Sequence, residues 1–255
     1  MSSISPRGIG AGSGIRFSSA AAASGGNDAF VKLLLHCDGA DTTTTFTDDS
    51  PSARGNATVG GNAQVDTAQS VFGGASALFD GTGDYLQYAN STDWNLGAAG
   101  SGDFTLDFRL RFNGTPAIAS LISAGDLSGT GWTLYWASNT LRIYDSSDKT
   151  VSWTPSASTW YHVAVARETS TIRVFIDGTS IGNLSGDVDM NNDSQAFRVA
   201  SDNPGFFQLN GWMDEIRISK GIARWTANFT PPSAAYSADA KIKQFMHHYK
   251  TMAAS

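Results

Sequence analysis

The chain has 255 residues, of which 41% are apolar and 16% are charged, enough for one large domain or two small ones with a hydrophobic core. Its formal net charge of -6 and pI of about 5.0 exclude the global basic field of a nonspecific nucleic-acid-binding protein, so we expect no nucleic-acid partner. The single cysteine, Cys37, excludes an intrachain disulfide and a cysteine-rich metal framework.

Residues 1–26 form the first predicted segment, an arm without a fold of its own. Too few large apolar side chains are present to offset the entropy lost on ordering. They are Ile4, Ile9, Ile15 and Phe17. Two alternatives stay open for this arm: a disordered leader, or a segment that orders on a partner. The arm has no apolar core resembling a signal peptide, and no run in the chain reaches the roughly 18 apolar residues of a membrane span, so we expect neither.

Short apolar runs with period 2 follow the arm, separated by turn residues. The 27 glycines and the predominance of aspartate over glutamate favour turns. In the clearest run, 104–112, apolar residues alternate with polar ones, which places Thr105 and Asp107 on a solvent face. Similar runs predict strands at 31–35, 76–79, 85–88, 132–136, 141–144, 161–166, 171–176, 197–200 and 213–219. The pattern predicts an all-β protein with two packed antiparallel sheets.

One predicted hairpin presents a candidate binding site. If 137–140 is a four-residue loop between two strands, then Tyr135, Arg142 and Tyr144 share the outward face. Exposed aromatic side chains stack on sugar rings or anchor a protein partner. Glycan contact, a protein interface and a plain solvated face are the alternatives for this set.

Residues 237–255 end the chain with a predicted short amphipathic helix. Its apolar positions recur at helical spacing. They are Ile242, Phe245, Met246 and Tyr249. A helix of this length is marginal alone, so it needs a surface on which to dock, either its own sandwich or a neighbouring molecule.

Five sequence blocks occur in a familiar order: LLLHCDG (33–39), FGGASALFDGTGDYLQY (72–88), FTLDFRLRF (104–112), TWYHVAVARETSTIRVFIDG (159–178) and GWMDEIRISKGIARWTANFTPP (211–232). In these blocks the chain resembles the laminin-G-like jelly rolls of the concanavalin A-like lectin and glucanase superfamily, of the kind found in bacteriophage virion proteins. The resemblance implies a two-sheet antiparallel jelly roll at 27–236, between the arm and the terminal helix. Because this superfamily contains lectins, enzymes, adhesion modules and virion parts, the fold alone does not assign a function.

The resemblance favours a non-enzymatic virion structural protein on the virion surface, such as a phage head decoration or a tail appendage. The arm and the helix would then bind other virion proteins in an oligomeric assembly, and the jelly roll would bind a cell-surface glycan or a protein. The alternative is a carbohydrate-binding module of a secreted protein at the bacterial cell surface. A glycoside hydrolase is less favoured, because it needs paired carboxylates and the chain has only two isolated glutamates, Glu168 and Glu215.

The resemblance also implies a structural calcium ion. In related jelly rolls an aspartate near the start of the chain and one in the final strand often surround an ion, and Asp38 and Asp214 occupy those positions here. Loop carbonyls would have to supply further ligands, because calcium takes six to eight oxygens. The alternative is that Asp214 caps a loop through backbone amides. No other cofactor is expected.

Overall fold

The computed structural model describes residues 26–192, 194–203 and 205–237. These residues contain two antiparallel sheets packed face to face and one short helical turn, η1 (Thr92–Trp94), so the expectation of an all-β two-sheet sandwich is confirmed. The predicted arm except Gly26, the predicted terminal helix except Ser237, and all the apolar side chains expected to attach them to partners lie outside the described residues.

Sheet 1 has eight antiparallel strands. They are β15 (Thr179–Asn183), β14 (Thr171–Ile176), β13 (Trp160–Glu168), β8 (Phe104–Phe112), β17 (Asn210–Lys220), β6 (Ser76–Asp80) and β5 (Gln64–Asp66) in spatial order, with β1 (Val31–Leu35) paired to β17. Because β1 and β17 are the first and last described strands, their pairing brings the two ends of the domain together.

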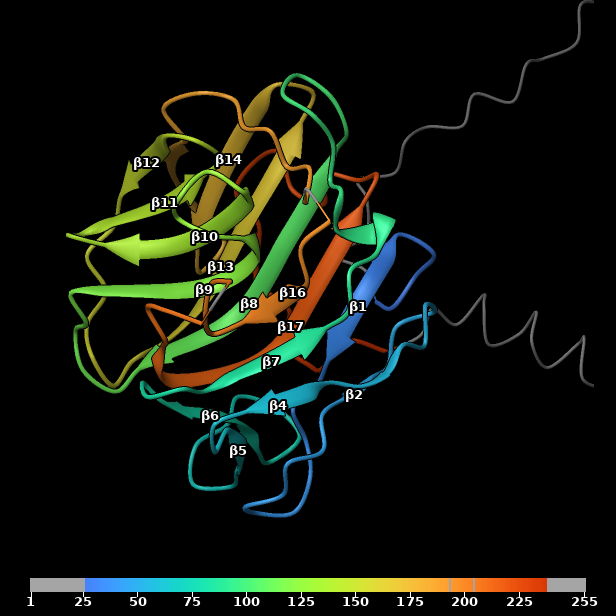
Figure 1. Ribbon diagram of the computed structural model, residues 1–255, viewed down its shortest axis with the longest axis vertical. Coiled ribbons are helices and arrows are strands. Elements are labelled where there is room, and N and C mark those ends of the chain that lie inside the picture. The colour runs from blue at the N-terminus through green and yellow to red at the C-terminus, as the bar shows by residue number, and fades with distance from the viewer. Residues whose placement is uncertain (1–25, 193, 204, 238–255) are drawn as a thin grey trace, which may run out of the picture.

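Sheet 2 has seven strands and packs against sheet 1 (Figure 1). In spatial order they are β12 (Asp148–Ser152), β11 (Thr140–Tyr144), β10 (Gly131–Ala137), β9 (Ile118–Gly125), β16 (Phe197–Val199), β7 (Tyr85–Tyr88) and β4 (Thr58–Gly60). A separate ribbon pairs β2 (Thr47–Asp48) with β3 (Gly55–Asn56).

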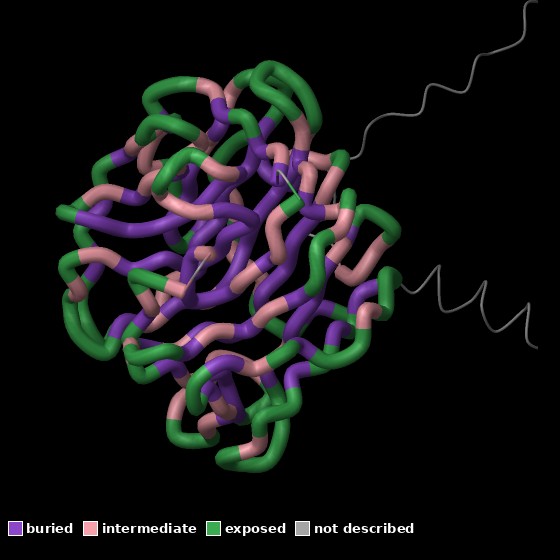
Figure 2. The backbone as a smooth tube through the Cα atoms, viewed as in Figure 1, coloured by how far each residue is buried: buried purple, intermediate pink, exposed green. Residues whose placement is uncertain are grey.

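The core lies between the two sheets, where alternate residues of each strand meet. Figure 2 shows buried positions running along the strands and exposed positions gathered in the connecting loops. The apolar face of β8 is fully enclosed, as its alternation predicts. It consists of Phe104, Leu106, Phe108, Leu110 and Phe112.

The outer face of sheet 1 is also buried, which corrects the expectation that β8 has a solvent face. Thr105 and Asp107 are both fully buried. The C-terminal strap (residues 221–236) crosses this face, where Trp225 packs on the small and aromatic side chains of β13 and β14. Thr105 donates to the carbonyl of Ile222, which fixes the strap to β8. Long-range packing, which alternation does not encode, therefore buries both faces of the strand.

Burial on both faces also explains why the central strand β9 was not predicted. Its residues are nearly all buried, and the small side chains of Ser120 and Ser123 lie on the outer face, where Phe207 and Ser201 contact β9 through hydrogen bonds. A strand enclosed on both sides has no polar alternation to detect. The short strands β2, β3, β4, β5, β12 and β15 were likewise not predicted.

The β10–β11 hairpin has the expected pairing but a shorter loop. Trp136 lies opposite Leu141, as expected, and Ala137 pairs with Thr140. Only Ser138 and Asn139 remain unpaired, with φ values of 49° and 60°. Two consecutive positive φ angles are typical of a type I′ turn, which replaces the predicted four-residue loop.

Candidate functional site

The outer face of sheet 2 carries the three residues singled out from the hairpin. Tyr135 lies opposite Arg142, and Tyr144 is on the same face of β11. Tyr135 is only 4% exposed, so the expectation that it projects into solvent was wrong. Its hydroxyl donates to Asp148, and Arg142 covers its ring while its Nη1 lies 2.8 Å from Asp148. Tyr135 therefore holds Arg142 in place, and Tyr144 is the half-exposed aromatic residue of the set.

Sheet register extends this face beyond the hairpin to residues that sequence reasoning did not single out. A single row crosses five strands, because each of its residues lies opposite the next. The row consists of Tyr144, Thr133, Ser123, Arg198 and Gln87. The Arg198 guanidinium lies 4.2 Å from the ring centroid of Tyr85, and its Nε donates to Gln87 at 2.8 Å. The alternation of residues 85–88 predicted a strand, but the sequence did not show that this strand lies beside the one that carries Arg198.

Two exposed phenylalanines stand on the loop beside this face. Phe206 is 61% exposed and Phe207 is 39% exposed. Their backbone is fixed: the Ser120 amide donates to the Phe207 carbonyl at 2.7 Å, and the Phe206 amide donates to Asp202 at 2.6 Å. Phe207 also has a φ of 55°, a strained value for a residue with a side chain. Phe206 and Phe207 thus present apolar rings to solvent from a hydrogen-bonded backbone.

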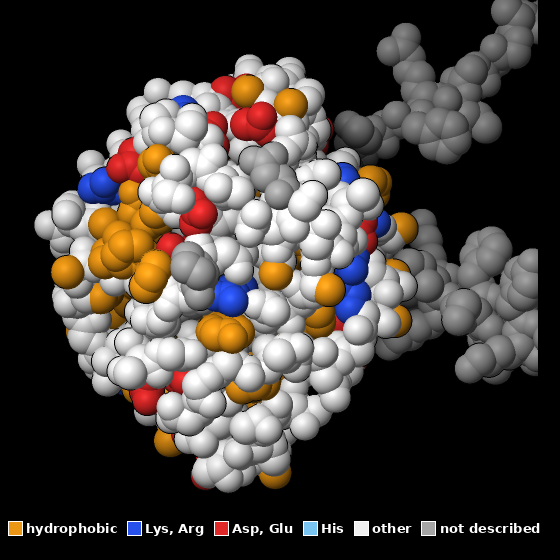
Figure 3. Space-filling model, in the orientation of Figure 1, with side chains coloured by type: hydrophobic (Ala, Val, Ile, Leu, Met, Phe, Trp, Pro, Cys, Tyr) orange, Lys and Arg blue, Asp and Glu red, His pale blue; other side chains and the backbone are white. Residues whose placement is uncertain are grey.

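The space-filling view shows how side chains are distributed over this face. Hydrophobic side chains gather over β10 and β11, and a basic side chain lies beside hydrophobic ones over β16 and β7 (Figure 3). Beneath the surface, the hydroxyls of Ser120 and Thr133 are buried without a hydrogen-bond partner among the described residues. These hydroxyls are not accessible, so the exposed part of the face offers aromatic rings and guanidinium groups, which recognise sugars and protein surfaces.

The two aspartates of the predicted calcium site have unequal environments. Asp214 is fully buried on β17, and its Oδ2 accepts from the amides of Val71 at 2.7 Å and Phe72 at 3.1 Å. Burial raises the pKa of Asp214 to about 7, against the lowering effect of the two amides. Asp38 is exposed and lies against Gly73, in the loop that those amides begin. The structure therefore shows the alternative role for Asp214, in which it caps a loop.

These residues fit a calcium ion incompletely. Asp214 Oδ1 is buried and has no hydrogen-bond partner in the described part of the chain, which suits a cation ligand. However, no group of three or more His, Cys, Asp or Glu side chains among the described residues is arranged to hold a metal. Calcium needs six to eight oxygens, so side chains supply too few. The calcium predicted at Asp38 and Asp214 is untested, and the two amides that Asp214 accepts favour its capping role.

Chelation tests that prediction directly. We expect EDTA to leave the melting temperature unchanged, because a carboxylate that caps amides needs no cation. Thermal denaturation followed by circular dichroism, with and without EDTA, is the measurement. A fall in melting temperature that added calcium restores, and that is absent in Asp214→Ala, would instead establish a bound metal.

The two glutamates lie in environments that do not form a hydrolytic pair. Glu168 is exposed at the end of β13 and lies 3.2 Å from Arg173. Glu215 is buried at a β-bulge, where one oxygen lies 2.6 Å from His36 Nδ1 and the other accepts from the Tyr236 amide. The hydrogen bond with Glu215 raises the pKa of His36, against the effect of burial. Both Glu215 oxygens are thus engaged in holding the chain.

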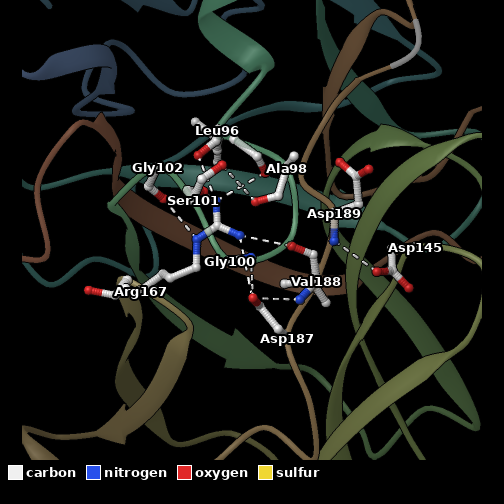
Figure 4. A network of polar contacts seen from close by, with 12 residues as sticks. Leu96, Ala98, Gly100, Ser101, Gly102, Asp145, Arg167, Asp187, Val188 and Asp189 are labelled. Atoms are coloured by element: carbon white, nitrogen blue, oxygen red, sulfur yellow. Dashed lines mark hydrogen bonds and ion pairs between the residues drawn. The ribbon is translucent and has the colours of Figure 1, made fainter.

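A buried guanidinium organises the loops at one end of the sandwich (Figure 4). Arg167, from β13, donates to the carbonyls of Gly102 and Val188 at 2.8 Å and of Leu96 and Gly97 at 3.0 Å. It also donates to the carbonyl of Ser101 and lies 3.6 Å from Asp187. The single guanidinium thus holds these loops together through their carbonyl oxygens, which is the role that a bound structural metal ion has in other proteins. The sequence analysis did not identify it.

The ends of the described domain lie together, away from the hairpin site. The Asn27 amide donates to the Ser237 carbonyl at 2.9 Å, and Arg217 donates to the Gly26 carbonyl at 3.3 Å. The neighbouring strand β1 lies on the opposite side of the molecule from β11 and β12 (Figure 1). Among the described residues, no helix has the length and hydropathy needed to span a membrane.

Comparisons with known proteins support the family resemblance. The Laminin_G_3 family model, described as the concanavalin A-like lectin/glucanases superfamily, matches residues 80–224. No curated protein matches the chain. Domain 4 of AbnA, a GH43 extracellular arabinanase from Geobacillus stearothermophilus, solved in complex with arabinotriose, is 15% identical, with a TM-score of 0.55 over 75% of this chain and 95% of that domain.

Two toxin domains have a similar fold. The receptor-binding domain of botulinum neurotoxin C/D mosaic serotype is 13% identical, with a TM-score of 0.53 over 86% of this chain and 51% of its own. The binding domain of botulinum neurotoxin DC, solved in complex with rat synaptotagmin II, is 15% identical, with a TM-score of 0.52 over 76% of this chain and 49% of its own. The chain thus spans about half of each toxin domain. At these identities the likeness shows the fold alone.

Proposed function

Because the chain belongs to the concanavalin A-like lectin/glucanases superfamily, we propose that it is a non-enzymatic binding protein whose jelly roll recognises a cell-surface glycan. One observation carries the proposal: the strap covers the outer face of sheet 1 over β13 and β14, whereas on the outer face of sheet 2 Tyr144, Arg142 and Arg198 are partly exposed. An aromatic ring beside planar charged groups matches the apolar face and the hydroxyls of a sugar.

A glycan array followed by titration of the best ligand tests this site. We expect Tyr144→Ala to weaken glycan binding by about tenfold or more, because the ring that stacks on the sugar is lost. Phe30→Ala is the matched control: Phe30 is 44% exposed but precedes β1, far from the hairpin. If Tyr144→Ala binds as tightly as the unaltered protein, sheet 2 is not the glycan site. If no glycan binds and a host surface protein does, the face is a protein interface.

We further propose that the chain is a virion structural protein, a head decoration or a tail appendage at the virion surface. Support comes from the place where the chain leaves the domain. The paired Asn27 and Ser237 put the starts of both extensions at one edge, while the candidate binding face lies on the other side. Residues 1–26 and 237–255 would attach the domain to other virion proteins. A carbohydrate-binding module of a secreted bacterial surface protein is the alternative, and a glycoside hydrolase is less favoured.

Truncation separates attachment from folding. We expect deletion of residues 1–25 to change the melting temperature by no more than a few degrees, because Gly26 and Asn27, which contact the domain, remain. Incorporation into particles, measured by mass spectrometry after co-expression with the genes beside this one, should be lost. If those genes encode polysaccharide-degrading enzymes rather than capsid or portal proteins, or if the truncated chain is incorporated normally, the virion proposal fails.

A further inference from the structure

Arg198 is held on the outer face of sheet 2 by three separate contacts. Its guanidinium carbon lies 4.2 Å from the ring centroid of Tyr85, its Nε donates to Gln87 at 2.8 Å, and its Nη1 donates to the Asp202 carbonyl at 2.9 Å. The ring of Tyr85 lies against Gly60, where an added Cβ atom would come within 2.2 Å of it. Glycine at position 60 therefore leaves room for the ring that positions the guanidinium.

These contacts leave two hydrogen-bond donors open to solvent. Arg198 Nη2 has no hydrogen-bond partner among the described residues and is not buried. Because arginine cannot accept a hydrogen bond, Gln87 turns its amide oxygen toward Nε, and its own Nε2 is likewise unpaired and accessible in the described part of the chain. Both groups donate and neither accepts, which matches the oxygens of a carboxylate.

The charge of Arg198 is not taken up by an ion pair with a described residue. Arg142, the other guanidinium of the proposed site, lies 2.8 Å from Asp148 and is neutralised by it. Asp202 acts on Arg198 electrostatically, but its carboxylate is buried, and its Oδ1 accepts from the Phe206 amide at 2.6 Å. Of the two guanidinium groups, Arg198 is therefore the one that can pair with an anionic group of a ligand.

Exposed apolar rings stand next to this guanidinium. An added Cβ atom at Gly205 would lie 3.2 Å from Arg198 Nη1, and the exposed Phe206 and Phe207 follow that glycine in the chain. Their loop is bonded to β9, which lies between the hairpin and β16. Sheet order puts three strand spacings, roughly 14 Å, between Tyr144 and Arg198. A ligand that reaches both residues would pass these rings.

We infer, on the basis of the proposed glycan-binding function, that the glycan bound on this face carries an acidic sugar whose carboxylate pairs with Arg198. The hydrogen bonds of a carboxylate to a guanidinium are charge-assisted, which makes them about twice as strong as neutral ones. The distance between Tyr144 and Arg198 exceeds the width of one sugar ring, so the ligand is an oligosaccharide. One of its sugars stacks on Tyr144, its acidic sugar binds Arg198, and an apolar sugar face between them contacts Phe206.

Acidic oligosaccharides and their methyl esters, which lack the charge, test the acidic-sugar site. The full chain is titrated calorimetrically, in EDTA, with a galacturonic acid tetramer, with sialyllactose and with the methyl ester of each, so that uronic and sialic acids are distinguished. We expect one of the two acids to bind at least about tenfold more tightly than its ester. Arg198→Gln should remove that preference, whereas Phe206→Ala should weaken acid and ester by equal factors. Arg173→Gln, at a surface arginine of sheet 1, should leave both affinities unchanged.

The outcomes separate this inference from the proposed function. Equal binding of each acid and its ester, or a preference that survives in Arg198→Gln, would overturn the acidic-sugar site. If esters or neutral glycans bind and Tyr144→Ala abolishes that binding, the proposed function stands without an acidic sugar. If no glycan binds, both proposals fail, and binding of a polyglutamate peptide that depends on Arg198 would identify a protein partner instead. Melting temperatures of the variants confirm that each is folded.

Discussion

Replacement of Arg167 by alanine should destabilise the protein by at least about 5 kcal/mol, and replacement by lysine by about 3 kcal/mol or more. The reason is the geometry in Figure 4: five loop carbonyls converge on one guanidinium that is fully buried. Alanine leaves those carbonyls buried without donors. Lysine keeps the charge, but its ammonium has three donors and no planar fork, so it cannot reach carbonyls on both sides.

Chemical denaturation of the full chain measures this effect. Arg173→Lys provides the matched control, since Arg173 lies on the neighbouring strand β14 and pairs at the surface with Glu168. We expect the control to cost less than about 1 kcal/mol, because surface ion pairs contribute little. An Arg167→Lys variant as stable as the control would mean that water or loop rearrangement satisfies the carbonyls, and that the loops do not depend on the guanidinium.

Arg167 also illustrates where sequence reasoning ends. Alternation predicted β8 and β14, because each has one face toward the core, and it predicted the pairing of β10 with β11, because these two strands are also close in sequence. An arginine near the end of β13 looks like an ordinary surface residue in that pattern. Its burial depends on carbonyls from loops about 65 to 70 residues earlier in the chain. No local pattern carries that information.

For the candidate site, the sequence likewise predicted which residues share a face but not which of them are buried. The shared face of Tyr135, Arg142 and Tyr144 follows from hairpin register, and the structure places them so. The burial of Tyr135 does not follow, because it depends on Asp148 from the next strand. The exposed Phe206 and Phe207 were missed for the opposite reason: an apolar pair in a loop has no period, and only the fold shows that it faces solvent.

The second large effect concerns the ion pair beneath the strap. Asp107 is fully buried, and its two oxygens lie 3.0 Å and 3.2 Å from the Arg217 guanidinium. The Tyr236 hydroxyl donates to the same carboxylate. We expect Asp107→Ala to cost about 4 to 5 kcal/mol, because a buried guanidinium loses its counter-charge and the strap loses an anchor. Loss of strap docking should appear as faster proteolysis within residues 221–236.

A double variant and a pH series distinguish the charge from the packing. Removing both partners, as in Asp107→Leu with Arg217→Met, should be less destabilising than Asp107→Ala alone, because no unpaired charge remains buried.

Burial would raise the pKa of Asp107, but Arg217 and His162 outweigh it and lower the pKa to about 2. Because this value lies below the unfolded value near 3.8, the carboxylate stabilises the protein above about pH 4, and the effect is lost as the pH falls toward 2. The difference in unfolding free energy between the unaltered protein and Asp107→Asn should therefore shrink over that interval. A constant difference would show that Asp107 acts by shape and hydrogen bonding alone, and that its charge does not hold the strap.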